Sequence, residues 1–207
     1  NASDNVVDLS SYSLSSCSNG CNDGVSWDYP DNVTFEPGTM VAPGDVYVVC
    51  HGSSDDIILA ECDQTFTYLS NGDDVFALTQ IGSGDILDII GTIGDDPGSG
   101  WEVAGVSDAT KDHTLVRDSS VESGNGGNWD ESAGDEDDSQ WVVLDQNTWS
   151  YLGSHPHEFE SAGCMDESAC NYDPEASTDD GSCLYNDCAG ACGGDAVEDD
   201  CGVCEGN

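Results

Sequence analysis

The segment NGDDVFAL, residues 71–78, joins a turn signal to an alternating apolar run. Asn71 and Gly72 tolerate the positive φ that tight hairpin turns demand. The run 75–78 that follows, like the run VYVV at 46–49, has the period of a strand that buries one face and leaves the other in water. These patterns predict short antiparallel strands.

Similar runs recur on both sides of this segment, between clusters of Gly, Asn and Asp. We predict strands at residues 6–9, 33–35, 45–50, 75–79, 86–91, 114–117 and 141–144. Short strands at this spacing are typical of a sandwich or barrel. Only residues 55–61 (DDIILAE) look helical, over about two turns, and the mostly polar residues 119–139 are interpreted as a long surface loop. The predicted fold class is all-β.

The charge of the chain is extreme. Its 207 residues contain 43 Asp and Glu against two Lys and Arg, which gives a formal net charge of -41. Such a polyanion repels nucleic-acid phosphates and acidic lipid headgroups, so binding to either is not expected. The longest apolar run, residues 46–50, is far shorter than the roughly 20 residues of a membrane span, so no membrane insertion is expected. Divalent cations are the first partners to consider.

Eleven cysteines indicate an oxidising compartment and therefore an extracellular or cell-surface protein. Their spacing changes near Ser161, which predicts a unit at 1–160 and a second at 161–207. Four cysteines in the first unit allow three pairings. We choose Cys17–Cys21, closing a tight turn, and Cys50–Cys62, tying a strand end to the short helix.

The tail holds seven cysteines, and their pairing is left open. These are Cys164, Cys170, Cys183, Cys188, Cys192, Cys201 and Cys204. An odd number leaves one unpaired, which we place at Cys201 or Cys204 and expect to pair outside this segment. A four-thiolate zinc site at 188, 192, 201 and 204 is the alternative to disulfides. Disulfides are favoured because the setting is oxidising and no Lys or Arg lies nearby to offset thiolate charge.

Five segments of the first unit resemble a lamin-tail domain of the secreted microbial type. They are DLSSYSL at 8–14, PGDVYVV at 43–49, NGDDVFAL at 71–78, ILDIIG at 86–91 and KDHTLVR at 111–117. The resemblance implies an immunoglobulin-like β-sandwich, a non-catalytic scaffold appended to secreted nucleases, phosphatases and adhesive surface proteins. The family usually begins with strands upstream of the segment that residues 1–9 resemble.

The tail resembles a second family. Residues 163–176 (GCMDESACNYDPEA) and 179–183 (DDGSC) look like the cysteine and aspartate repeats of marine microbial surface proteins, which are distantly akin to thrombospondin type 3 repeats. Residues 187–194 and 199–204 look like a partner motif that follows them. The resemblance implies a calcium-loaded spacer.

Calcium requires six to eight oxygen ligands gathered on a flexible loop. The calcium candidates lie in two groups, Asn171, Asp173, Asp179 and Asp180 in the first, and Asp195, Glu198, Asp199 and Asp200 in the second. A strict EF-hand is excluded, because aligning Gly181 with its invariant glycine puts Ala176 at the first ligand position. The alternative is a solvated acidic loop without metal. Calcium is the only cofactor expected.

Three further motifs have an ordinary and a functional interpretation. The tripeptides at Asn1 and Asn32 are N-glycosylation sequons, which also arise by chance. Residues 155–157 (HPH) could bind a soft metal or form a surface turn. Trp101, Trp129, Trp141 and Trp149 could stack on sugar rings or fill the core. No nucleophile elbow, phosphate loop or H-E-x-x-H motif is present, so no catalytic residues are predicted.

These patterns predict a non-catalytic extracellular structural protein, a segment of a surface adhesin or of a fibre or filament subunit, stiffened by disulfides and calcium. Its expected partners are copies of itself or adjoining domains of a longer chain, joined head to tail through an open sheet edge. The alternative is a carbohydrate- or surface-binding accessory module of a secreted multidomain enzyme, of the nuclease or phosphatase type. That alternative requires an exposed Trp or Tyr platform beside a polar pocket.

Overall fold

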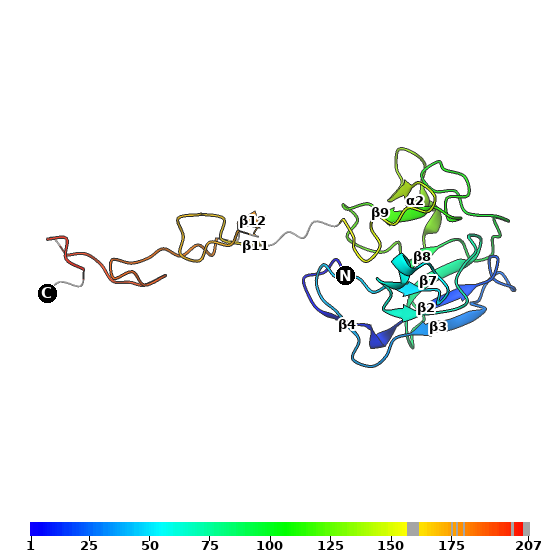
Figure 1. The fold of residues 1–207 in the computed structure, drawn as a ribbon, viewed down its shortest axis with the longest axis horizontal. Helices are drawn as coiled ribbons and strands as arrows, with labels where there is room; N and C mark the ends of the chain where they lie inside the picture. The colour runs from blue at the N-terminus through cyan, green and yellow to red at the C-terminus, as the bar shows by residue number, and fades with distance from the viewer. Residues whose placement is uncertain (157–161, 175, 177, 180, 200, 205–207) are drawn as a thin grey trace. The chain divides into compact units, whose positions relative to one another are not determined.

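The computed structural model of this chain describes residues 1–156, 162–174, 176, 178–179, 181–199 and 201–204. The chain forms two compact units, Asn1–His157 and Glu158–Asn207 (Figure 1). The boundary predicted near Ser161 falls outside the described residues. Strands dominate the first unit, as the prediction of an all-β protein requires, and helices are few and short.

A four-stranded antiparallel sheet forms the centre of the first unit (Figure 1). Its order is β3 (Tyr29–Thr34), β2 (Tyr12–Cys17), β7 (Val75–Gln80) and β8 (Ile86–Ile90). Around it lie three strand pairs, β1 (Val7–Asp8) with β4 (Met40–Val41), β5 (Val49–Cys50) with β6 (Gln64–Thr65), and β9 (Thr114–Arg117) with β10 (Trp141–Leu144). The helical segments are η1 (Leu9–Ser11), α1 (Asp56–Leu59) and α2 (Trp129–Ala133).

The strand β2 was not among those predicted, and its alternating stretch YSLS directs the serines rather than the apolar residues into the core. Ser13 and Ser15 are buried. Both hydroxyls hydrogen-bond Thr79 Oγ1 on β7, at 2.9 and 2.8 Å. A buried hydroxyl is tolerated when it has a hydrogen-bond partner, so small polar residues here take the positions that a hydrophobicity pattern assigns to apolar ones.

The predicted strand at 45–50 is wrong over its first four residues, since only Val49–Cys50 pair in a strand. Carboxylate oxygens accept the backbone N–H groups that would otherwise donate to a neighbouring strand. The N–H of Val46 donates to Asp45 Oδ1, and that of Val48 donates to Asp63 Oδ2 at 2.7 Å. Local side-chain acceptors of this kind compete with secondary structure.

The interpretation of residues 119–139 as a surface loop is wrong for the helix α2 that they contain. Trp129 of this helix is 3% exposed and Ala133 is 5% exposed. The Trp129 ring lies 6.5 Å from that of Trp101 and 6.0 Å from that of Trp141. These rings belong to the main core cluster with Val75, Ala77 and Ile89 of the sheet. Because the residues around Trp129 are mostly polar, their sequence does not indicate that Trp129 packs in the core.

The two outer strands of the sheet, β8 and β3, differ in whether other residues cover their unpaired edge. Asn125 covers β8, because its side chain donates to Ile89 O and accepts the N–H of Ile89, while the N–H of Gly126 donates to Leu87 O. The edge strand β3 contains Pro30, which lacks an N–H, and Asp31, whose φ is 49°. A proline and an irregular backbone limit the pairing of an exposed edge strand with another strand.

Candidate functional site

The first unit contains the disulfides Cys17–Cys21 and Cys50–Cys62, the two pairs predicted from the sequence. The tail contains three more, Cys164–Cys183, Cys170–Cys192 and Cys188–Cys204. Cys201 is a free, exposed thiol. Since three of the four sulfurs in the zinc alternative are in disulfides, that thiolate set does not exist in this structure.

The tail disulfides overlap along the chain. The loop closed by Cys164–Cys183 contains Cys170, whose partner Cys192 lies beyond it, and the loop closed by Cys170–Cys192 contains Cys188, whose partner is Cys204. Each crosslink therefore begins before the preceding one ends. At every peptide bond between residues 164 and 204, at least one disulfide bridges the two sides.

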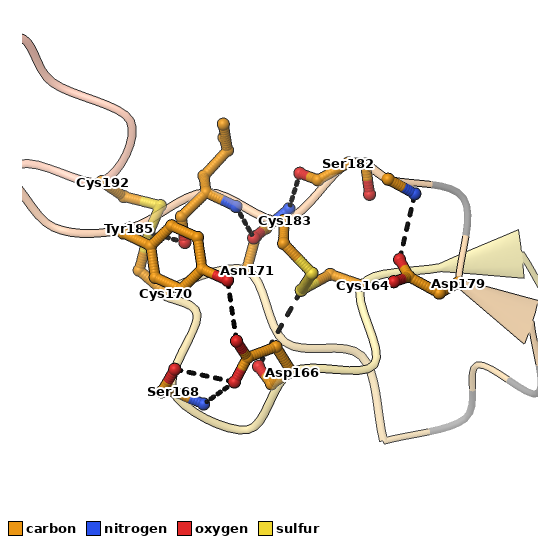
Figure 2. Close-up of a disulfide and its surroundings, with 12 residues drawn as sticks. Cys164, Asp166, Ser168, Cys170, Asn171, Asp179, Ser182, Cys183, Tyr185 and Cys192 are labelled. Carbon is orange, nitrogen blue, oxygen red and sulfur yellow. Dashed lines mark hydrogen bonds between the residues drawn. A yellow bond between two sulfur atoms is a disulfide. The ribbon is translucent and has the colours of Figure 1, made fainter.

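Around the first of these bonds, short hydrogen bonds to Asp166 connect neighbouring segments (Figure 2). Its carboxylate accepts the backbone N–H and the hydroxyl of Ser168, at 2.8 and 2.7 Å, and the Tyr185 hydroxyl at 2.7 Å. The Ser168 and Tyr185 hydroxyls lower the pKa of Asp166, and the same carboxylate raises the pKa of Tyr185. Asp166 thus links two stretches of the tail that are 19 residues apart.

The side-chain amide of Asn171 donates one hydrogen bond and accepts another, as the backbone of a β-strand does (Figure 2). Its Oδ1 accepts the N–H of Leu184 at 2.7 Å, and its Nδ2 donates to Ser182 O at 2.8 Å. The N–H of Cys170 donates to Leu184 O beside them. The amide oxygen considered as a calcium ligand is therefore used to hold residues 182–184.

Two turns of the tail repeat each other at a spacing of twelve residues. Asp187 and Asp199 each accept two backbone N–H groups on Oδ1, from residues two and four positions further along the chain. Gly190 and Gly202 follow at φ of 80° and 76°, which glycine adopts without strain. The shared signal, D-x-x-G-x-C at 187–192 and 199–204, is visible in the sequence.

The pKa of the Asp187 carboxylate is lowered by the hydrogen bonds of its turn. The backbone N–H of Ala191 is the largest cause that lowers the pKa of Asp187, and burial opposes it. A carboxylate that accepts several N–H groups is stabilised in its charged form. Asp187 is therefore a structural anion that fixes a turn.

The other calcium candidates belong to different turns of the tail, and some lie outside the described residues. Asp179 Oδ1 accepts the N–H of Gly181 (Figure 2), and Asp195 is exposed. The backbone N–H of Asp173 donates to Cys164 O. Asp180 and Asp200 lie outside the described residues. Within the part of the chain that the structure describes, no three His, Cys, Asp or Glu side chains gather as a metal site requires. Calcium binding stays a prediction.

The other singled-out residues lie in the first unit. Asn1 Nδ2 donates to Asn5 O and Val41 O, and Asn32 Nδ2 donates to Ser16 Oγ, so both sequon nitrogens are hydrogen-bonded and glycosylation stays a prediction. His155 Nε2 lies 3.0 Å from Arg117 O, and His157 falls outside the described residues. Trp101 and Trp129 fill the core, whereas Trp149 is 39% exposed.

Among the described residues, no helix has the length and apolar character needed to cross a membrane. Comparison of this chain with protein-family models, with curated proteins and with solved structures finds no match. The two family resemblances therefore rest on the quoted residues alone and stay predictions.

Proposed function

We propose that this chain is a non-catalytic extracellular structural segment, in which an immunoglobulin-like unit of lamin-tail type is followed by a connector that limits extension under tension. The overlapping disulfides of the tail carry this proposal. Five disulfides in the chain favour an oxidising compartment. A surface adhesin or a filament subunit is a setting in which a connector bears load.

The mechanical argument follows the shortest covalent path through the tail. From Cys164 it crosses to Cys183, follows five peptide steps to Cys188, and crosses to Cys204, with Cα–Cα distances of 4.7 and 5.4 Å across the two disulfides. At roughly 3.5 Å per extended residue, this path is about 30 Å long, whereas the reduced tail reaches about 140 Å over the same residues. The oxidised connector therefore cannot extend beyond about 30 Å.

Stretching single molecules of the full chain between two handles tests this proposal. We expect reduction to release about 110 Å of contour length from residues 164–204, at the extended rise per residue. Replacing Cys17, Cys21, Cys50 and Cys62 with serine provides the matched background, because it removes the contribution of the first unit. An oxidised tail that extends to its full reduced length would contradict the proposal.

A second variant locates the effect. In Cys188→Ser/Cys204→Ser, the shortest path runs through the Cys170–Cys192 bond, whose Cα–Cα distance is 5.7 Å, and eighteen peptide steps. The oxidised tail should then extend to about 70 Å, at the same rise per residue. An unchanged extension would mean that the Cys188–Cys204 bond bears no load.

For assembly, the proposed partners are copies of the chain or adjoining domains, arranged head to tail. Edge strand β3 is the candidate contact, because Asn125 covers β8. Pro30 and the irregular Asp31 restrict an incoming strand to the part of β3 after residue 31. Electron microscopy of the native material should reveal ordered end-to-end particles, and a monodisperse monomer would contradict this part of the proposal.

A further inference from the structure

One face of the central sheet carries a row in which a small side chain lies between two aromatic residues. Ser16 of β2 lies directly opposite Tyr29 of β3 and directly opposite Phe76 of β7. Directly paired residues share a face, and neighbouring strands are about 4.8 Å apart. Tyr29 and Phe76 therefore flank the small Ser16 at a spacing of about 10 Å between their backbones.

A hollow of about 420 Å³ opens over this row, and Tyr68, Asn32 and Asp74 also line it. Its volume lies within the range of small-molecule sites, roughly 300–1,000 Å³. Tyr29 is 50% exposed and Tyr68 is 78% exposed. The Phe66 ring meets that of Tyr68 edge-on at 6.0 Å, which supports the Tyr68 ring from one side. Single exposed aromatics need no explanation, but here they converge on one concavity.

Hydrogen bonds within the protein hold the polar groups of the hollow in position. Asn32 Nδ2 donates to Ser16 Oγ at 2.8 Å, and Asp74 Oδ1 accepts the N–H of Asn19 at 3.1 Å. A primary amide has a second N–H and a carbonyl oxygen, and a carboxylate has a second oxygen. Asn32 and Asp74 therefore present both a donor and acceptors beside the aromatic rings, while their own positions are held by the protein.

We infer that this hollow binds a neutral sugar ring of a glycan. A pyranose has apolar C–H faces that pack on aromatic rings and hydroxyl groups at its rim that pair with an amide and a carboxylate. A ring packed between two others needs contacts of about 4 Å on each side, and the backbones of Tyr29 and Phe76 are about 10 Å apart. Anionic ligands are disfavoured by the charge of -41.

The main competing ligand is a quaternary ammonium group, which also binds in aromatic pockets. The lining argues for the sugar, because Ser16, Ser18, Asn32 and Thr67 add polar groups that a quaternary ammonium cannot use as a hydrogen-bond partner. Asp74 is the sole charged side chain among the lining residues described for this hollow, and it already accepts one backbone N–H.

Calorimetric titration of the full chain, produced in bacteria so that Asn32 carries no glycan, tests the inference. The probes are cellohexaose, laminarihexaose and chitohexaose, with choline chloride as the cation. We expect at least one oligosaccharide to bind, and Tyr68→Ala and Tyr29→Ala each to raise its Kd about tenfold through lost stacking. Tyr151→Ala, which removes a ring that is 40% exposed elsewhere in the unit, is the matched control and should leave the Kd unchanged.

Backbone NMR of the same titration locates the ligand, and the amides of Ser16, Asn32 and Asp74 should shift. Circular dichroism of each variant verifies its fold, and Tyr68→Ala keeps the test decisive if Tyr29→Ala fails to fold, since Tyr68 lies outside the sheet. The inference is overturned if no oligosaccharide binds at millimolar concentration, if both variants bind as well as the parent, or if choline alone binds with the same dependence on the two tyrosines.

Discussion

Asp187 shows how one carboxylate can organise a turn in a chain with almost no cations. Its ordinary pKa of 3.8 is lowered in the folded protein, chiefly by the N–H of Ala191. A group whose pKa is lowered on folding contributes stability above its unfolded pKa and loses that contribution as the pH falls through the folded value. The turn at 187–191 should therefore hold at neutral pH and loosen as the pH falls below 3.8.

NMR titration measures this property directly. The amide proton of Ala191 should shift with a midpoint below 3.8, as Asp187 becomes protonated. Asp187→Asn is the control, because its amide oxygen can still accept the N–H groups while the titration disappears. A midpoint at or above 3.8 would contradict the role assigned to these hydrogen bonds.

Cys201 permits a second prediction at the scale of the residue. It is the one free thiol among the cysteines, all of which are described, and it is exposed. We expect iodoacetamide to modify one thiol per native chain, and non-reduced peptide mapping to recover Cys164–Cys183, Cys170–Cys192 and Cys188–Cys204. Peptides that join Cys188 to Cys201 would show that the pairing differs from this structure.

At the scale of the element, α2 is short but anchors the core. Trp129 packs between Trp101 and Trp141 and is 3% exposed. Trp129→Ala should lower the free energy of unfolding by about 3–5 kcal/mol, because it removes a large buried side chain and leaves a cavity. Urea titration of the first unit's transition measures the loss.

Trp149→Ala is the matched control for that experiment. Trp149 is 39% exposed and Trp129 3%, so removal of Trp149 should cost clearly less than removal of Trp129. Equal losses for the two variants would mean that α2 does not anchor the core. The same comparison separates the core role of Trp129 from the general effect of deleting an indole ring.

Charge dominates at the scale of the whole molecule. The net charge is -41, and the only cations besides the N-terminal amine and the histidines are Lys111, which donates to Ser99 Oγ, and Arg117, which pairs with Asp88. Self-repulsion of this size destabilises a compact state, and salt screens it. We expect the melting temperature to rise with sodium chloride for both units.

Calcium can be distinguished from screening by matching ionic strength. If the tail binds calcium, calcium chloride should raise its melting temperature above the value in magnesium or sodium chloride at equal ionic strength, and chelator should reverse the rise. Asp173→Asn/Asp179→Asn is the variant expected to abolish the difference. A tail transition that depends only on ionic strength would exclude calcium binding.

The sequence by itself determined the properties that depend on neighbouring residues and on counting. Alternating runs such as 75–78, with a turn signal before them, indicate strands because side-chain alternation is local. The all-β class follows from them. Eleven cysteines, an odd number, cannot all pair within this chain whatever the fold, and the acidic excess disfavours nucleic acid without knowledge of any contact.

Only the tertiary structure decided what depends on residues distant along the chain. The burial of Ser13 relies on Thr79, and the row of Tyr29, Ser16 and Phe76 relies on strand register across the sheet. The choice of Cys201 over Cys204 as the free thiol depends on which sulfur reaches Cys188. Such pairings are set by packing between segments, which periodicity within one segment does not encode.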